Sequence, residues 1–213
     1  IGDLNTLLTN DKTSTVNAIN ELYNKIDDSL VVYMPITQDL TPNTYASGNC
    51  TVFITNSRKI IMIDSGAWHS WTEIHGELMK LGINHIDYFL LSHFHADHYS
   101  NIPSLISDGY IDADTIAYMP RLNGITPPDE DDEATVRGYL SICTDQRVFS
   151  SDNPLVVDDM HFDFFNCDKS DYDYYNSINS TYNNYSVCAY VTYKNTKILM
   201  PADIMSDAMT YLV

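Results

Sequence analysis

Basic residues are scarce in this sequence of 213 residues. The 11 lysines and arginines stand against 29 acidic residues, which gives a formal net charge of −18 at pH 7. Because nucleic acids are held mainly through their phosphates by lysine and arginine, this balance disfavours a nucleic acid as the partner. The same charge favours solubility and attracts cations, divalent metals included, to the surface.

Long apolar runs and closely spaced cysteines are also absent. The sequence has no run of about 20 apolar residues that could span a membrane, and it shows no signal-peptide pattern. No short spacing pairs the cysteines, so we find no cysteine-based structural zinc motif, and whether any two form a disulfide stays open. The cysteines are Cys50, Cys143, Cys167 and Cys188.

A run of metal-binding residue types stands at residues 93–98, which read His-Phe-His-Ala-Asp-His. Neutral imidazoles and carboxylates bind first-row divalent metals, and four such groups in one turn would be costly to bury without a counter-ion. The apolar stretch 86–91 before the run reads as a buried strand, and the apolar spacing over 101–106 indicates a helix after it. The alternative is an exposed polar loop that happens to be rich in histidine.

The spacing inside this run differs from that of zinc sites carried on one helix. His93 and His95 are two residues apart, and in extended backbone such residues point to the same side, so both rings can reach one ion. Asp97 and His98 follow where the chain must turn, and they can face a second ion. Carboxyl ends of strands are the usual place for sites in α/β folds.

The run resembles the His-x-His-x-Asp-His signature of the metallo-β-lactamase superfamily. Other segments are similar to the same family: a hairpin over 50–66, a helix over 71–81 stopped by Gly82, and a late hairpin over 188–200 that leads to Asp203. The stretches 86–88 and 183–186 are most similar to the hydrolase domain of bacterial competence proteins for DNA uptake. The resemblance covers roughly residues 31–213.

This resemblance implies an α/β fold, the αββα sandwich of the family, with two mixed sheets and helices outside. It also implies two divalent metal ions, which we expect to be Zn²⁺; they would share a water molecule, lower its pKa and so supply the nucleophile of a hydrolase. Asp64 is expected to orient the ligands. The implied ligands are His93, His95, Asp97, His98 and Asp203, and Asp97 is also the candidate catalytic residue.

The sequence departs from the family's ligand pattern at two places. Asn183 stands in the stretch where a histidine is expected before the late hairpin, and it could be a weak oxygen ligand or support a ligand. The final histidine of the family, which lies beyond the aspartate at the position of Asp203, is not found. Since the sequence begins with Ile1 and stops at Val213, we expect the domain to be truncated at its C-terminus.

Several segments near the expected site have two interpretations. His69 could donate a hydrogen bond to substrate or be an ordinary loop residue, and His161 is expected to be a surface or edge histidine of a strand. The tyrosine-rich stretch 168–185 could recognise sugars or quaternary amines by stacking, or could be an insertion that covers the rim. Residues 127–133 are expected to form an acidic surface loop, followed by a short helix over 134–142.

Residues 1–30 carry a separate pattern. The segment 4–22 resembles a short repeat of bacteriophage tail-fibre and baseplate proteins, where it is a connector, often in trimers. Val16, Ile19, Tyr23 and Ile26 have the spacing of a coiled-coil seam, and so short a seam does not fold alone. The preferred interpretation is a short coiled coil that forms a homo-oligomer, with a trimer as the favoured state. The alternative is a helix docked on its own domain.

These patterns predict a connector (1–30) joined to a metal-dependent hydrolase domain (31–213) in a phage tail, and so an extracellular virion protein. The expected partners are other tail proteins and a polymer of the host cell envelope, cleaved at a phosphodiester or an ester. Neither nucleic acid nor membrane is expected as a partner. The competing prediction is a non-catalytic structural or adhesion module of the virion, which the two missing histidines favour. A β-lactamase proper is disfavoured because the expected third histidine is absent.

Overall fold

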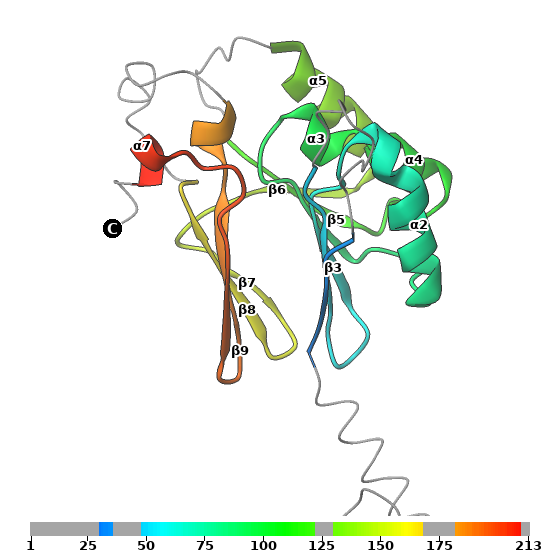
Figure 1. Cartoon of the computed structure of the whole chain (residues 1–213), viewed down its shortest axis with the longest axis horizontal. Coiled ribbons are helices and arrows are strands. Elements are labelled where there is room, and N and C mark those ends of the chain that lie inside the picture. Colours follow the sequence, from blue (N-terminus) through cyan, green and yellow to red (C-terminus); the bar gives the residue numbers. More distant parts are fainter. Residues whose placement is uncertain (1–29, 36–47, 122–129, 168–181, 210–213) are drawn as a thin grey trace, which may run out of the picture.

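Two β-sheets form the centre of the computed structural model, which describes residues 30–35, 48–121, 130–167 and 182–209 (Figure 1). The first sheet has the strand order β1-β2-β3-β4-β5-β6, and the second has the order β10-β9-β8-β7. The strands of the first sheet are β1 (Val31–Tyr33), β2 (Thr51–Ile54), β3 (Ile60–Ile63), β4 (Tyr88–Leu90), β5 (Ile116–Met119) and β6 (Asp145–Val148). Those of the second are β7 (Leu155–Val157), β8 (Met160–Phe165), β9 (Cys188–Tyr193) and β10 (Thr196–Met200).

The longer helices all lie on the outer side of the first sheet in the part of the chain that the structure describes (Figure 1). They are α2 (Trp71–Lys80), α4 (Ile102–Ser107) and α5 (Glu130–Tyr139). Short helical turns connect the other elements: η2 (Trp68–Ser70), α3 (Ala96–Tyr99), η3 (Leu140–Ile142), η4 (Tyr182–Tyr185) and α7 (Ser206–Met209). The predicted α/β sandwich is confirmed. Among the described residues, its outer helix layer covers the first sheet.

The two sheets differ in strand direction. In the first, β1, β2 and β3 run antiparallel, whereas β3 to β6 pair in parallel. In the second, every pairing between described strands is antiparallel. The expectation of two mixed sheets was therefore wrong for the second one. Short turns join β7 to β8 and β9 to β10, and such connections permit only antiparallel neighbours.

The inner strands of the first sheet are buried on both faces, because helices cover one face and the second sheet covers the other. Every residue of β2 and β3 is buried. One apolar core lies between helices and sheet and contains Met62 and Ile74. The other lies between the sheets, where the Phe53 and Phe162 rings meet edge to face with centroids 5.4 Å apart. Fully burying such a side chain stabilises the fold by about 1.5–3 kcal/mol.

Several predicted elements are confirmed, with small shifts at their ends. Helix α2 buries Ile74 and Leu78, four residues apart, and it ends where Gly82 has a φ of 67°. There the Gly82 and Ile83 amides donate to the carbonyls of Met79 and Leu78, which satisfies the last turn of the helix. The helix after the histidine run is α4, and the late hairpin is β9 with β10.

The acidic stretch 127–133 corrects one expectation. Its second half, Glu130–Glu133, is the first turn of α5 rather than a loop. Acidic side chains favour this position because the N-terminus of a helix carries a partial positive charge. The Tyr99 hydroxyl donates a 2.5 Å hydrogen bond to Asp132, so the start of α5 is tied to the turn that follows the histidine run.

Three strand ends place the candidate site at one edge of the sandwich. Because β3, β4 and β5 are parallel, their carboxyl ends meet at the same edge. Asp64 follows β3 there, and His93 follows β4. The second sheet is joined to this edge by the Val187 amide, which donates to the Ser92 carbonyl at 2.9 Å. Strand β10 returns to the same edge and leads to Asp203.

Some expectations fall outside the described residues. The connector and coiled-coil seam, over residues 1–29, lie there, and so does most of the tyrosine-rich stretch, residues 168–181. Among the described residues, no helix is both long enough and apolar enough to cross a membrane. The four cysteines are all buried, and no disulfide joins them.

Gly48 tests how tightly the loops pack at the site edge. A Cβ at Gly48 would lie 2.1 Å from the backbone oxygen of Asp97 and 2.5 Å from the backbone nitrogen of Ala67. Since these backbone atoms cannot yield cheaply, we expect Gly48→Ala to lower the free energy of unfolding by about 3 kcal/mol. Urea denaturation measures this change.

Gly76→Ala, within α2, is the matched control for this substitution. Apart from its chain neighbours and the backbone of its own helix, no heavy atom lies within 4 Å of a Cβ built at Gly76. This substitution should raise the free energy of unfolding by up to about 1 kcal/mol, since alanine favours helix interiors. Equal stabilities of the two variants would contradict the close packing at Gly48.

Candidate metal centre

Three side chains from two distant segments converge at this edge. His93, His98 and Asp203 each offer a nitrogen or oxygen atom, and these atoms all lie within 4.8 Å of one another. Both histidines are buried, whereas the Asp203 side chain is about one-third exposed, at 34%. The arrangement therefore has a buried imidazole side and a side open to solvent.

The local backbone explains how the histidines meet. After β4 the chain bends at Phe94, His95 is extended with φ and ψ of −81° and 144°, and α3 begins at Ala96. The His93 and His95 rings meet, since Nε2 of His93 lies 3.1 Å from Nδ1 of His95. Phe94, between them, points the opposite way into the core. The turn of α3 then brings the His98 ring to a centroid distance of 4.0 Å from the His93 ring.

Both aspartates approach the same nitrogen of His98. Asp97 Oδ1 lies 3.9 Å from His98 Nε2, and Asp203 Oδ2 lies 3.5 Å from it. The structure thus brings together three of the five residues expected to bind metal. Of the other two, His95 lies beside His93 and Asp97 beside His98, but both are outside the group whose donor atoms are all within 4.8 Å of one another. Their role as ligands stays a prediction, but the donor set, imidazole nitrogens and carboxylate oxygens, suits divalent first-row metals.

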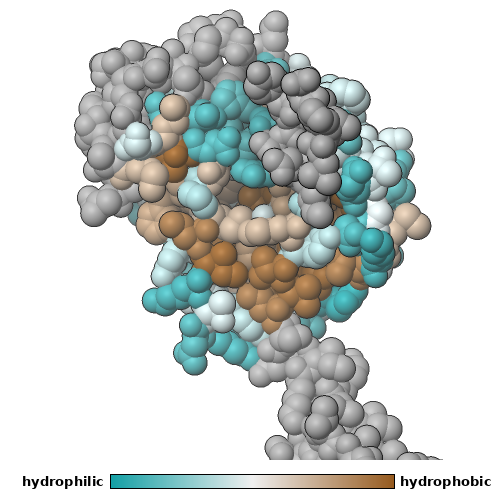
Figure 2. All heavy atoms as spheres, in the orientation of Figure 1, coloured by the Kyte–Doolittle hydropathy of each residue, from teal (hydrophilic) through white to brown (hydrophobic). Residues whose placement is uncertain are grey.

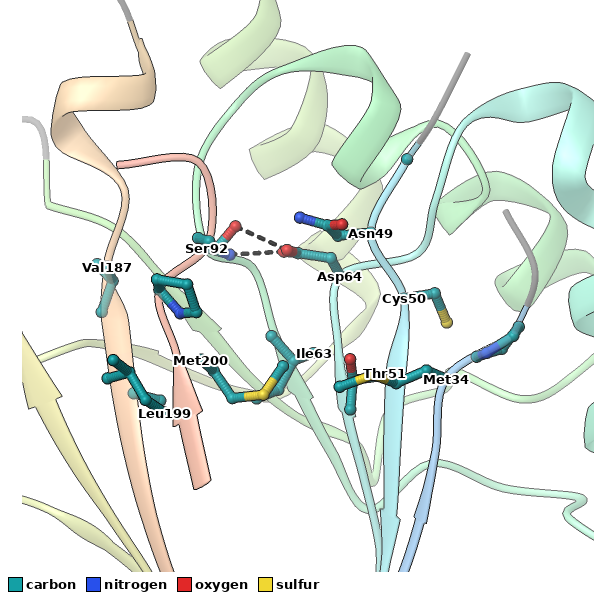
Figure 3. A pocket seen from close by; sticks show the side chains of 15 residues that line it. Met34, Asn49, Cys50, Thr51, Ile63, Asp64, Ser92, Val187, Leu199 and Met200 are labelled. Carbon is teal, nitrogen blue, oxygen red and sulfur yellow. Dashed lines mark hydrogen bonds between the residues drawn. The ribbon is translucent and has the colours of Figure 1, made fainter. Parts of the chain in front are cut away.

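Asp64 holds the two strand ends and one imidazole at once. Its Oδ1 accepts a hydrogen bond of 2.7 Å from the Ser92 amide, and its Oδ2 accepts one of 2.7 Å from the Ser92 hydroxyl (Figure 3). Nδ1 of His98 lies 2.8 Å from the same Oδ2. Asp64 has a φ of 58°, a left-handed conformation that aspartate tolerates better than most residues.

These contacts set which nitrogens of the neutral rings carry a proton. A carboxylate only accepts, so Nδ1 of His98 donates to Asp64, and its Nε2 is left toward Asp203. The Ser92 hydroxyl donates to Asp64, so at 3.0 Å it accepts from Nδ1 of His93. Both neutral imidazoles therefore present an unprotonated Nε2 to the cluster, the form that binds a metal.

Charge interactions within the cluster shift the pKa values of its members. Burial alone would lower the pKa of His98, but the charge of Asp64 and hydrogen bonds to Asp203 and Asp64 outweigh it and raise that pKa to about 10. Burial, then the charges of His98 and His95, lower the pKa of His93 well below its usual range. The hydrogen bond from His98 lowers the pKa of Asp203. Without metal, His98 is therefore the protonated member.

Three supporting residues were not assigned that role from the sequence. The Asn49 amide donates a 3.1 Å hydrogen bond to Asp203 Oδ1, but nothing in the local sequence signals that role. Ser92 directly precedes the histidine run, so its place was visible, but its three partners were not. Asn101 donates to the carbonyls of Ser65 and Ala67, at 2.7 and 2.8 Å, and so fixes the loop after Asp64.

The other residues singled out from the sequence lie on three different elements. His69 lies on η2 with its ring edge-on to Trp68, and it is outside the converging group of donors. His161 faces outward from β8 and lies 3.3 Å from Asp163, which confirms the expected surface histidine. Asn183 lies on η4, and its side chain interacts with His93.

A cavity of about 350 Å³ lies between the sheets beside this cluster. Asp64, Ser92 and Asn49 line one end of it, and the rest is mostly apolar, with Ile63, Leu199 and Met200 among its walls (Figure 3). In the space-filling view, apolar residues also gather across the middle of this face (Figure 2). The cavity reaches the supports of the cluster, Asp64 and Ser92, rather than its converging nitrogen atoms.

Comparisons with known proteins agree with this architecture. The model of the metallo-beta-lactamase superfamily matches residues 44–114, which include Asp64 and the histidine run. The structure is similar to the metallo-beta-lactamase fold protein YhfI from Bacillus subtilis, with 17% identity and a TM-score of 0.51 over 80% of this chain and 61% of that chain. No curated protein sequence matches the chain significantly.

Two further solved structures have a similar fold. A metallo-beta-lactamase-like protein from Thermotoga maritima is 13% identical, with a TM-score of 0.51 over 80% of this chain and 76% of that chain. The flavodiiron protein from Giardia intestinalis is 10% identical, with a TM-score of 0.50 over 75% of this chain and 36% of that chain. Such low identities show the fold alone.

Together, the family model and these structures support a metallo-beta-lactamase superfamily domain. The chain spans about three-fifths of YhfI, at 61% of that protein's length. The expected similarity to competence proteins and to tail connectors stays a prediction.

Asp64→Asn tests whether this carboxylate prepares the site. An amide cannot accept from Ser92 and His98 with the same charge and geometry, so we expect affinity for a divalent metal to fall by about 10–100-fold. Calorimetric titration of metal-stripped protein with Zn²⁺ measures the change. Asp163→Asn, on the outward face of β8, is the control and should bind as the unchanged protein does. Equal affinities for the two variants would show that Asp64 has no such role.

The raised pKa of His98 predicts a pH dependence in metal-stripped protein. The folded pKa, about 10, lies above the usual value of 6.5, so the contribution of protonated His98 to stability is complete below pH 6.5. It should be lost as the pH rises from 6.5 toward 10. Urea unfolding between pH 6 and 10, in the presence of a chelator, measures this loss. If His98→Gln shows the same decline over that window, another group is responsible.

Proposed function

We propose that this chain is a metal-dependent hydrolase whose centre is formed by His93, His95, Asp97, His98 and Asp203. The convergence of His93, His98 and Asp203 atoms within 4.8 Å carries this proposal. Metal-dependent hydrolases occur in the superfamily that the family model indicates. Fold alone does not give function, so the proposal depends on the site itself.

The donor set supports a centre with two ions, which we propose to be Zn²⁺. His93 and His95 present facing nitrogens 3.1 Å apart, and these would hold one ion. Asp97 and His98 would hold the other, and Asp203, beside His98, would contact both. His98 must lose its proton before it can bind an ion, because its protonated ring has no free nitrogen.

The residues around the centre then have defined roles. When bound, divalent ions of this kind supply a water whose pKa is lowered to about 7 and polarise the bond under attack. Asp64 and Ser92 hold the His98 and His93 rings with Nε2 toward the centre. Asp97 is our candidate catalytic residue, since its carboxylate is partly exposed, lies beside His98 and can orient substrate.

We propose a phosphodiester or an ester in a polymer of the host cell envelope as the substrate, and a phage tail as the setting. The N-terminal resemblance to tail-fibre connectors supports this setting and implies tail proteins as partners. It also implies a homo-oligomer, with a trimer as the favoured state. The net charge of −18 argues against nucleic acid as the polymer.

Metal content and chelation test the hydrolase directly. We expect the purified chain to hold up to two equivalents of divalent metal and to hydrolyse bis(p-nitrophenyl) phosphate or p-nitrophenyl acetate. A chelator should abolish turnover, and added Zn²⁺ or Mn²⁺ should restore it. Asp203→Asn should reduce turnover to near background, because it removes the charge shared by both halves of the centre.

His161→Ala is the control for that substitution, since His161 lies on the outward face of the second sheet, and it should keep full turnover. A chain that binds metal weakly or not at all, and shows no chelator-sensitive turnover, would contradict the hydrolase. That result would favour the alternative function, a non-catalytic adhesion module, which the histidines missing from the family pattern already support.

A further inference from the structure

The side-chain oxygen of Asn183 is buried next to the His93 ring, and no hydrogen bond of ordinary geometry satisfies it. Asn183 Oδ1 has no solvent-accessible surface to speak of, and no described atom pairs with it at ordinary hydrogen-bond geometry. The great majority of buried polar atoms in proteins have a hydrogen-bond partner. An exception at a functional site calls for an explanation, such as a bound ion.

The side chain of Asn183 faces the imidazole of His93. It is close enough to interact with that ring directly. Asn183 therefore adds a buried side-chain oxygen beside His93.

The backbone around Asn183 holds this side chain in place. The Ser186 amide donates to the Asn183 carbonyl at 3.1 Å, which closes the η4 turn. Asn166 donates to the carbonyls of Asn184 and Ser186, at 3.0 and 2.8 Å, and anchors the same turn to the end of β8. The Val187 amide ties the turn to Ser92, the residue next to His93. The position of Asn183 is thus fixed relative to the histidine run.

We propose that Asn183 Oδ1 is a ligand of the ion held by His93 and His95, an assignment that rests on the proposed function. That ion would then have two imidazole nitrogens with neutral and carboxylate oxygens, in place of a third imidazole. Neutral carbonyl oxygens suit harder cations such as Mn²⁺, whereas imidazole suits Zn²⁺. The preference of this centre for Zn²⁺ over Mn²⁺ should therefore be weaker than that of a site with three imidazoles.

Three substitutions at Asn183 separate a ligand from a packing residue. Asn183→Leu keeps a similar volume but has no donor atom, Asn183→Asp keeps an oxygen, and Asn183→His supplies a nitrogen. Asn195→Leu, on the turn between β9 and β10 at the opposite end of the hairpin from Asp203, is the control. Calorimetric titration of the metal-stripped full chain with Zn²⁺ and with Mn²⁺ gives affinities, and the visible spectrum of the Co²⁺ form reports the donor set.

We expect Asn183→Leu to weaken one of the bound ions by about tenfold or more, and Asn183→Asp to retain it. Asn183→His should raise the ratio of Zn²⁺ to Mn²⁺ affinity by about tenfold and change the Co²⁺ spectrum. Asn195→Leu should leave both unchanged. The circular dichroism of each metal-stripped variant shows that the fold is retained, and the aspartate and histidine variants decide the matter if the leucine variant does not fold.

Two outcomes would overturn this assignment, and they differ. If the unchanged protein binds metal, but the aspartate and histidine variants bind Zn²⁺ and Mn²⁺ with the same affinities and the same Co²⁺ spectrum, Asn183 is not a ligand and the proposed hydrolase stands. If the unchanged protein binds none of these metals, the proposed function fails together with this assignment.

Discussion

The carboxylate of Asp64 is the contact on which the rest of the site depends. It lies at the end of β3, accepts from the backbone and hydroxyl of Ser92 at the end of β4, and accepts from His98 after the following turn. A charged group with 2% exposure would be unfavourable alone, but three hydrogen bonds and a protonated imidazole compensate for it. The same contacts orient two imidazoles, so stability and preparation of the site come from one group.

The site also depends on a sandwich whose sheets are held together at its edge. The histidine run belongs to the first sheet, and Asp203 follows the second, so neither sheet alone contains the donor set. Phe94, which separates His93 from His95 in the sequence, anchors the run because its side chain is buried in the core. The link from Val187 to Ser92 and the close contact of Gly48 with Asp97 fix the loops in register. In the proposed hydrolase, substrate would approach from the open side of the cluster.

Much of this arrangement could be predicted because it is local in the sequence. The spacing of His93 and His95 indicates a shared side in any extended backbone, and the buried strand before them places the run at a strand end. Ile74, Leu78 and Gly82 predict both the face and the end of α2. These patterns work because backbone period and burial act over a few residues.

Other features depended on contacts between distant segments. Asn49 reaches Asp203 across 154 positions, and no local pattern contains that information. The strands of the second sheet are antiparallel because short turns join neighbouring strands. The family resemblance implied two mixed sheets, so this direction was predicted wrongly. Residues 130–133 resembled a loop by composition, but they form the first turn of α5, where acidic side chains are favourable and where Tyr99 donates to Asp132.

Anomalous X-ray diffraction at the zinc edge, from crystals soaked in Zn²⁺, tests the central claim most directly. We predict a strong anomalous peak in contact with Nε2 of His93, Nε2 of His98 and the carboxylate of Asp203. A fully soaked crystal with no peak at this cluster, or with these three side chains turned away from one another, would contradict the account.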